Sequence, residues 1–317
     1  MAHKDGQMLC GFEQIISVIP SNLEQVDQLV KLSTLNADAL QKLVSGGLRK
    51  IPVDSEDQPL SVLVHQAIAC LAEKIPDLAG RTEMIMLAHS VPILAPSDVS
   101  FFDLCVDELG FENVPRIALS GQPCAILHMG VKLASGLLSD ISSEHGVLLL
   151  GADKVYSPKD RLFFGSAMGD SVIAAFVTHE TKRHQVLAVL SHSQIIAYDG
   201  EKSPAEDIAK FRALNPSMIR FAIEKCLAEG EVALDDLALI VPHTPYTMIW
   251  DVIAELLRFP RDRILTDYIS ETGHLNSNDS FAHYIRAVDE GRIREGDLAL
   301  LINPGFGGTR GCTLIRS

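Results

Sequence analysis

Residues 226–245 read CLAEGEVALDDLALIVPHTP, and residues 70–92 read CLAEKIPDLAGRTEMIMLAHSVP. Each stretch begins with the same four residues at the end of a helix-like run, and each continues into an apolar, strand-like segment that ends in a turn. This pattern suggests an internal duplication, with two similar α/β halves that meet near residue 170. No low-complexity or Pro-rich linker separates the halves, so we expect them to pack together with a site between them.

Strand-like and helix-like runs alternate along the whole chain, which predicts an α/β protein. The expected strands are Met84–Leu87, Arg116–Leu119, Val147–Leu150, Ile173–Val177, Val186–Leu190, Leu237–Val241, Leu298–Ile302 and Thr313–Arg316. The expected helices are Leu23–Leu32, Ala37–Val44, Leu60–Glu73, Val99–Leu109, Ala125–Leu138, Pro216–Ala228, Thr247–Leu257 and Ser280–Glu290.

Composition restricts the partners. The chain has 317 residues, 47% of them hydrophobic, and a formal net charge of −14. This charge disfavours nucleic acid and anionic membranes, because binding either requires clustered Lys and Arg. No apolar run approaches the ~20 residues of a membrane span, and the polar start lacks a signal-peptide pattern, so we expect a cytoplasmic protein. The six cysteines have neither disulfide-framework nor zinc-knuckle spacing.

Cys124 is the candidate nucleophile. It follows a strand-like run and the turn Ser120-Gly121-Gln122-Pro123, and it opens an apolar helix that we expect to be buried on all sides. A cysteine at a helix N-terminus feels the positive end of the helix dipole, which favours the reactive thiolate. The amides there can also stabilise an oxyanion. The alternative is a cysteine that only fills space in the core.

Two histidines and a glycine-rich turn follow in the second half. His243 lies directly after a strand, where a side chain can reach a cleft and serve as a general base for a cysteine. His274 lies in the small, polar loop before another helix. The turn Asn303-Pro304-Gly305-Phe306-Gly307-Gly308 can bring a backbone amide into a site, because glycine allows positive φ and close approach. The alternatives are capping or surface histidines and an ordinary tight hairpin.

The order of these features resembles the β-ketoacyl-acyl-carrier-protein synthase III family of the thiolase superfamily along nearly the whole chain. The motifs that carry the resemblance are Gly151-Ala152-Asp153, Lys159-Asp160-Arg161, residues 164–170 (FGSAMGD), Ile240-Val241-Pro242-His243, Gly273-His274, residues 287–293 (AVDEGRI), Gly305-Phe306-Gly307-Gly308 and Leu314-Ile315-Arg316. The resemblance implies a duplicated thiolase fold with a layered αβαβα core, and a homodimer. It places the nucleophile in residues 1–170 and the catalytic histidines and glycine-rich turn in residues 171–317.

The resemblance also implies residue roles. Cys124 would take the acyl group, His243 would be the first catalytic histidine, and Gly308 or Gly307 would supply an oxyanion amide beside that of Cys124. His274 stands where the family has an asparagine. Asn276 and Asp279 are nearby candidates for that third role, although each residue type is also common in turns and helix caps.

The donor site departs from the family pattern as well. Arg161 occupies a matching basic position and is the candidate donor-binding residue. The family's tryptophan and arginine that grip coenzyme A fall near Gln41 and Ser45, and Tyr246 and Met248 replace polar and basic positions. A carrier protein is acidic, so its docking would need a local basic patch, for which Arg258, Arg261 and Arg263 are candidates.

These observations favour acyl transfer through a Cys124 thioester, in fatty-acid-like or secondary metabolism. The donor is expected to be acyl-CoA or the phosphopantetheine thioester of an acyl carrier protein, with no permanently bound cofactor. The alternatives are decarboxylative Claisen condensation with a malonyl-carrier protein, hydrolysis of the acyl-enzyme, and a catalytically silent subunit of a heterodimer. Cys124, His243 and His274 have the ligand types of a zinc site but no spacing signature, so no metal is expected.

Overall fold

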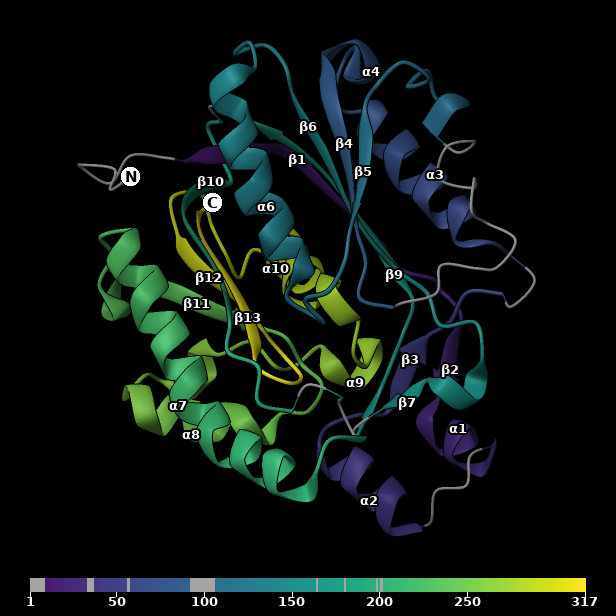
Figure 1. Cartoon of the computed structure of the whole chain (residues 1–317), viewed down its shortest axis with the longest axis vertical. Helices are drawn as coiled ribbons and strands as arrows, with labels where there is room; N and C mark the ends of the chain where they lie inside the picture. The colour runs from purple at the N-terminus through teal and green to yellow at the C-terminus, as the bar shows by residue number, and fades with distance from the viewer. Residues whose placement is uncertain are drawn as a thin grey trace.

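The structure of the chain is a computed structural model that describes residues 9–32, 37–55, 58–91, 106–163, 165–179, 181–197, 199 and 202–317. Its main feature is a nine-stranded sheet in the order β11-β12-β13-β10-β1-β9-β6-β4-β5 (Figure 1). These strands are β1 (Cys10–Val18), β4 (Thr82–Ala88), β5 (Arg116–Leu119), β6 (Gly146–Asp153), β9 (Ser171–Thr178), β10 (Gln185–Ser193), β11 (Leu237–Pro242), β12 (Leu298–Gly305) and β13 (Thr309–Arg316). The short strands β2 (Leu23–Gln25) and β3 (Lys50–Pro52) pair with each other, as do β7 (Leu162–Phe163) and β8 (Ser166–Ala167).

The strand order repeats between the two halves of the sheet. In the first half, β5 and β6 flank β4 in parallel, β9 is antiparallel to β6, and β1 is antiparallel to β9. In the second half, β12 is parallel to β11, β13 is antiparallel to β12, and β10 is antiparallel to β13. A parallel bridge between Ile240 and Ile264 stands where a counterpart of β5 would lie. The repeated topology agrees with the duplication that the sequence suggests.

The two halves of the sheet meet at a short antiparallel contact between β1 and β10, where Cys10 is opposite Val186 and Gly11 is opposite Gln185. Strand β9 pairs with β6 and β1, so the topology groups it with the first half. The predicted halves, 1–170 and 171–317, instead divide the chain just before β9. We propose that the division falls between β9 and β10. The last strand of each half, β9 in the first and β13 in the second, is then antiparallel to both of its neighbours in the sheet.

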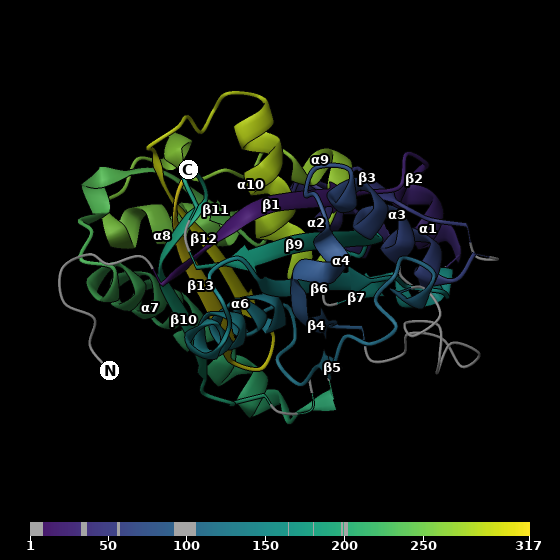
Figure 2. The ribbon, with the colours of Figure 1, turned by 90° about the horizontal axis from the view of Figure 1, so that it is seen from above.

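The helices form layers on either side of each half-sheet. Helices α6 and α10 lie between the half-sheets and share one core with both of them (Figure 1). Helix α3 packs on the outer face of the first half, and α7 and α8 pack on the outer face of the second (Figure 2). This arrangement is the predicted αβαβα layering. The helices are α1 (Val26–Leu32), α2 (Ala37–Ser45), α3 (Leu60–Ala72), α4 (Leu78–Arg81), α6 (Ile126–Leu137), α7 (Ala205–Glu229), α8 (Met248–Leu257), α9 (Ile269–Thr272) and α10 (Asp279–Asp289).

Every predicted strand overlaps an observed one, but several element boundaries differ. Strand β1 was not predicted, because the polar pair Glu13 and Gln14 interrupts its apolar pattern beside a bulge. The predicted helix Leu23–Leu32 starts as β2, because residues 23–25 pair with β3. Helix α7 starts well before Pro216 and continues through it. Most of the predicted helix Val99–Leu109 lies outside the described residues.

Helix α6 begins in the core but does not stay there. Its first turns bury Ile126, Leu127 and Val131, whereas Lys132 and Leu133 face solvent, so the expectation of burial on all sides is wrong for its second half. The helix is therefore anchored most firmly at the end that carries Cys124. Within the described residues, no helix combines the length and apolar character needed to cross a membrane.

His128 is a polar residue in the central helical layer. Its Nδ1 lies 2.8 Å from Thr313 Oγ1, and its ring packs against Phe281 with the ring centroids 5.0 Å apart. Burial lowers the pKa of His128 to about 4, because the charged ring would lose its hydration. The folded protein therefore holds this side chain in its neutral form.

We expect His128 to make stability depend on pH. Between the ordinary pKa of 6.5 and the folded value of about 4, the unfolded chain binds the proton and the folded chain does not. The stability present above pH 6.5 is thus lost as the pH falls towards 4, by about 2 to 3 kcal/mol for this one group. Urea unfolding of the wild type and of His128→Asn at pH 7 and pH 4.5 measures the loss. Equal losses in the two proteins would contradict this assignment, since other buried histidines affect both.

Candidate active site

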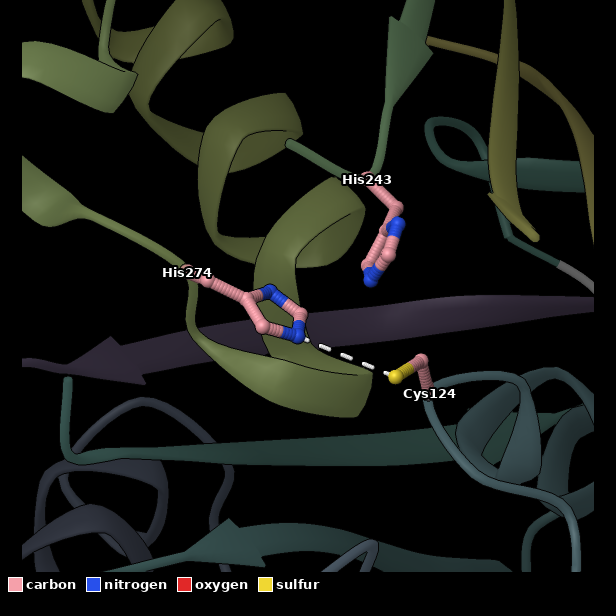
Figure 3. A group of neighbouring side chains, drawn as sticks. All are labelled: Cys124, His243 and His274. Atoms are coloured by element: carbon pink, nitrogen blue, oxygen red, sulfur yellow. Dashed lines mark hydrogen bonds between the residues drawn. The ribbon is translucent and has the colours of Figure 1, made fainter. Parts of the chain in front are cut away.

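Three predicted site residues come together in a buried cluster between the two halves. Figure 3 shows Cys124, His243 and His274 pointing towards one another. They come from the turn before α6, the end of β11 and the loop before α10, and their exposed fractions are 9%, 3% and 3%. One ligand-type atom from each residue lies within 4.8 Å of the others. The first half therefore supplies the sulfur and the second half supplies the imidazoles.

The backbone of Cys124 has an unusual conformation. Its φ of 61° lies in the left-handed region, which costs a residue with a Cβ atom free energy and is common at functional sites. The Cys124 amide donates to Ser90 Oγ at 3.0 Å, and the Cys124 carbonyl accepts from Asn303 Nδ2 at 2.8 Å. Helix α6 begins two residues later, at Ile126, so the sulfur lies near the N-terminus of a helix as predicted.

His274 connects the sulfur to a carboxylate. Its Nε2 lies 3.7 Å from Cys124 Sγ, and its Nδ1 donates to Asp279 Oδ2 at 2.7 Å. Asp279 also accepts the backbone amides of Thr244 and Leu275, at 2.9 Å and 2.7 Å. The contacts therefore form a chain from Asp279 through His274 to Cys124. A chain of this kind orients a base beside a nucleophile.

Asp279 and Asn276, the two candidates for a third role, differ in what they contact. Asp279 is held against His274, whereas the buried side-chain nitrogen of Asn276 has no hydrogen-bond partner among the described residues. Asn276 has a φ of 55°, which marks it as the turn residue before α10. The geometry therefore favours Asp279 over Asn276.

The two histidines have opposite electrostatic environments. Burial alone would lower the pKa of His274, but the charge and hydrogen bond of Asp279, with a contribution from Cys124, raise it to about 10. Burial would raise the pKa of Asp279, but the charge of His274 lowers it to about 2. Burial and the neighbouring His274 hold the pKa of His243 well below its usual range. At neutral pH, His274 is thus an imidazolium paired with Asp279, and His243 is neutral.

His243 is the cluster member whose ring nitrogens are free. Neither nitrogen has a hydrogen-bond partner among the described residues, and the ring stands edge-on to His274 with the centroids 4.4 Å apart. Its backbone is fixed, since the amide donates to the Ile302 carbonyl and the carbonyl accepts from Trp250 Nε1. A neutral, buried imidazole with free nitrogens can take a proton from an incoming group.

The glycine-rich turn packs directly on the nucleophile turn. A Cβ on Gly305 would lie 1.9 Å from the Pro123 carbonyl oxygen, so only glycine allows this approach. Thr309 Oγ1 donates to the same oxygen at 3.0 Å. The Gly308 amide makes a long bond, 3.4 Å, to the Gly305 carbonyl. The predicted oxyanion amides are those of Cys124 and of Gly308 or Gly307. The Cys124 amide already donates to Ser90 Oγ, so an acyl oxygen would have to compete with Ser90 for that amide.

Arg161, the candidate donor-binding residue, is not presented to a ligand. It is 1% exposed, and its two terminal nitrogens donate to the two carboxylate oxygens of Asp170, each at 2.9 Å. Asp170 also accepts the amides of Asp54 and Val155. A phosphate would have to break this paired geometry, so we propose a structural role for Arg161.

The other donor-side positions are more exposed or are already paired. Gln41 and Ser45 are exposed on α2, and Met248 is 55% exposed at the start of α8. Arg261 donates to the Asp251 carboxylate and to the Ile264 carbonyl, which reduces the charge it could offer to an acidic partner. Arg263 donates to the carbonyls of Ala238 and Asp235, which leaves its charge uncompensated by them. Arg258 and Arg263 therefore remain candidate basic contacts.

Comparisons with known proteins agree on one group. A family model described as "3-Oxoacyl-[acyl-carrier-protein (ACP)] synthase III C terminal" matches residues 227–317. The β-ketoacyl-[acyl-carrier-protein] synthase III of Rhizorhabdus wittichii is 26% identical over 293 residues, which cover 85% of this chain and 88% of that protein. The crystal structure of 3-oxoacyl-[acyl-carrier-protein] synthase III from Aquifex aeolicus VF5 has a TM-score of 0.80 at 18% identity and covers 97% of this chain and 100% of that one. The chain is therefore similar to β-ketoacyl-[acyl-carrier-protein] synthase III proteins, and residues 227–317 match the C-terminal model of that family.

The duplicated thiolase fold is thereby confirmed. A further solved structure, the acyltransferase ChlB3, has a TM-score of 0.83 at 18% identity, with 97% of each chain covered. Synthases and an acyltransferase thus share this fold, so the choice of reaction depends on the site residues and not on the architecture.

Two residues that the sequence did not point out hold the nucleophile turn. Ser90 and Asn303 bind the amide and the carbonyl of Cys124. A signal for Ser90 was present, because His89-Ser90 in the first repeat corresponds to His243-Thr244 in the second. Asn303 had no comparable signal, since its partners lie far away in the sequence.

Asn303 should be one of the costliest residues to replace. Its Nδ2 donates to the carbonyls of Cys124 and Ser277, so Asn303→Leu leaves two buried acceptors without this donor. We expect a loss of about 2 to 4 kcal/mol in the free energy of unfolding, measured with urea. Asn22→Leu is the control at an exposed position, where the side-chain amide donates a single, longer bond of 3.3 Å. A similar cost for both variants would mean that the Asn303 bonds are not special.

Proposed function

We propose that this protein transfers acyl groups through a thioester on Cys124. The observation that carries the proposal is the chain of contacts from Cys124 through His274 to Asp279, with the His243 imidazole beside it, which has no hydrogen-bond partner among the described residues. Asp279 orients His274 beside the sulfur nucleophile, and His243 is available to act on a second substrate. The donor would be acyl-CoA or the phosphopantetheine thioester of an acyl carrier protein.

Loading of the enzyme follows from the charges in the site. The Cys124 thiolate attacks the donor carbonyl, the new carbon–sulfur bond forms, and the bond to the donor sulfur breaks. The His274 imidazolium can give its Nε2 proton to the departing thiolate, and Asp279 keeps the ring oriented throughout. The amide of Cys124, and that of Gly308 or Gly307, would receive the oxyanion once the acyl oxygen displaces Ser90.

Transfer then uses the free histidine. Neutral His243 takes the proton of an acceptor hydroxyl or amine while the acceptor attacks the thioester, and the Cys124 sulfur leaves as a thiolate. The proton taken from the acceptor replaces the one that left with the donor thiol. Over the whole cycle, one thioester bond is exchanged for one ester or amide bond.

Decarboxylative condensation with a malonyl-carrier protein is the second candidate. It needs two donors for one enolate oxygen, and the close pair His243 and His274 could supply them. In the present geometry, however, His274 Nε2 faces Cys124 Sγ, which leaves His243 as the free group. We therefore favour transfer to a hydroxyl or amine, and release of carbon dioxide from a malonyl acceptor is the measurement that would decide for condensation.

We also propose a homodimer. Strand β5 is the last strand of the sheet, and Ile117 on it is 40% exposed. Among the described residues no strand pairs with its outer edge, and an apolar edge of this kind is a site of strand pairing between chains. The turn after β5 leads straight to Cys124, so pairing there would lie next to the proposed nucleophile.

Mass spectrometry of the intact protein tests the nucleophile. After incubation with a panel of acyl-CoA and acyl-carrier donors, the wild type should gain the mass of one acyl group, and Cys124→Ala should not. His283→Gln is the matched control and should load like the wild type, because His283 is buried nearby but bonds to Thr272. An adduct that persists in Cys124→Ala would show that another residue is the nucleophile, as would a wild type that never loads.

Rapid-quench kinetics should separate the two imidazole roles. Asp279→Asn removes the carboxylate that orients and charges His274, so we expect loading to slow by at least about 100-fold. His243→Gln should load at a rate near that of the wild type and then accumulate the acyl-enzyme, because the acceptor keeps its proton. The reverse pattern, with slow loading in His243→Gln and accumulation in Asp279→Asn, would exchange the two assignments.

A further inference from the structure

We propose that the same three side chains, when not acylated, form a binding site for a single Zn²⁺ ion, and that the ion blocks acyl loading. The ligands would be Cys124 Sγ, His274 Nε2 and one ring nitrogen of His243. This inference goes beyond acyl transfer, and it would make the enzyme reversibly inhibited by a thiophilic metal.

The distances suit a tetrahedral ion. With a metal–sulfur bond of about 2.3 Å and a metal–nitrogen bond of about 2.0 Å, the sulfur lies about 3.5 Å from each nitrogen, and the two nitrogens lie about 3.3 Å apart. Cys124 Sγ and His274 Nε2 are already 3.7 Å apart. All three ligand atoms lie within 4.8 Å of one another, so His243 has to move by up to about 1.5 Å to complete the set.

His243 is the residue that points to a ligand. It is 3% exposed, and neither of its ring nitrogens has a partner among the described residues. A buried polar group without a partner is unfavourable, and an ion between the rings would satisfy it. As Figure 3 shows, the His243 ring is directed towards the space between Cys124 and His274.

The surroundings of the cluster also resemble those of a zinc site in their chemistry. A metal-bound histidine usually donates its other ring N–H to a carboxylate, which fixes the ring and strengthens the ligand. His274 has this contact, since its Nδ1 donates to Asp279 at 2.7 Å. Thiolate with two imidazoles is a donor set that Zn²⁺ prefers, and a fourth position would stay open for water.

Binding of the ion would exclude catalysis because it uses the same electron pairs. The sulfur lone pair that attacks a donor and the His243 lone pair that accepts a proton would both be bonded to the metal. The Nε2 proton of His274, and any proton on the sulfur, would leave to solvent as the ion enters. No group is oxidised or reduced, so a chelator should restore the free site.

Cobalt(II) and zinc titrations of the protein test the site without relying on activity. The wild type should bind one Co²⁺ with the near-ultraviolet absorption of a cobalt–thiolate bond, and one equivalent of Zn²⁺ should abolish that absorption. Cys124→Ser and His243→Gln should each bind at least about 100-fold more weakly, and Asp279→Asn about 10- to 100-fold more weakly, through His274. All variants should carry Cys70→Ser, because Cys70 is a half-buried thiol that could bind metal by itself.

His283→Gln is the matched control and should keep the wild-type metal affinity. Retention of the one-ion absorption in Cys124→Ser or in His243→Gln would overturn the proposal. Alkylation of the wild type tests the site without depending on the folding of any variant. Zn²⁺ should slow the reaction of Cys124 with iodoacetamide at least about 10-fold. The alkylated wild type should no longer bind the ion. If Zn²⁺ gives no protection, the proposal is wrong even if acyl loading is confirmed, so the two proposals fail separately.

Discussion

The carboxylate of Asp279 is the group on which the arrangement of the site depends. It is fully buried at the start of α10, where the positive end of the helix dipole favours a negative charge. It binds the end of β11 through the Thr244 amide, the loop before α10 through the Leu275 amide, and the ring of His274. One side chain thus sets both histidines, since His243 directly precedes Thr244. An apolar residue there would leave three donors without their acceptor.

A second carboxylate makes the corresponding connection between the two halves. Asp153, at the end of β6, accepts the amides of Ser90 and Val91 from the first half and the amide and hydroxyl of Ser277 from the second. Burial raises the pKa of Asp153, and the four donors oppose that shift. Ser90 in turn accepts the Cys124 amide. The position of the sulfur relative to the histidines is therefore set by two buried acids and not by surface contacts.

Much of the fold and part of the site could be predicted from sequence, for reasons that differ from element to element. Strands such as β6 and β11 could be predicted because each is a short apolar run, which can be recognised from neighbouring residues in the sequence. Cys124 and His243 could be singled out because each follows a strand-like run, and His274 because it lies in a motif that resembles synthase III. The pairing of Arg161 could not be predicted, because its partner, Asp170, is brought to it by the folded chain, and a sequence does not show whether a cation is already paired. Asn303 was missed for the same reason, as its acceptors are brought to it by β12.

The contact between β1 and β10 has a mechanical consequence. Only a short register joins the two half-sheets edge to edge, and the layer of α6 and α10 fills the space between them. The sulfur lies in the first half and both imidazoles lie in the second, and the bonds of Asn303 and Asp153 join the nucleophile turn to the second half. The distance between Cys124 Sγ and His274 Nε2 therefore depends on how these few buried bonds position one half against the other.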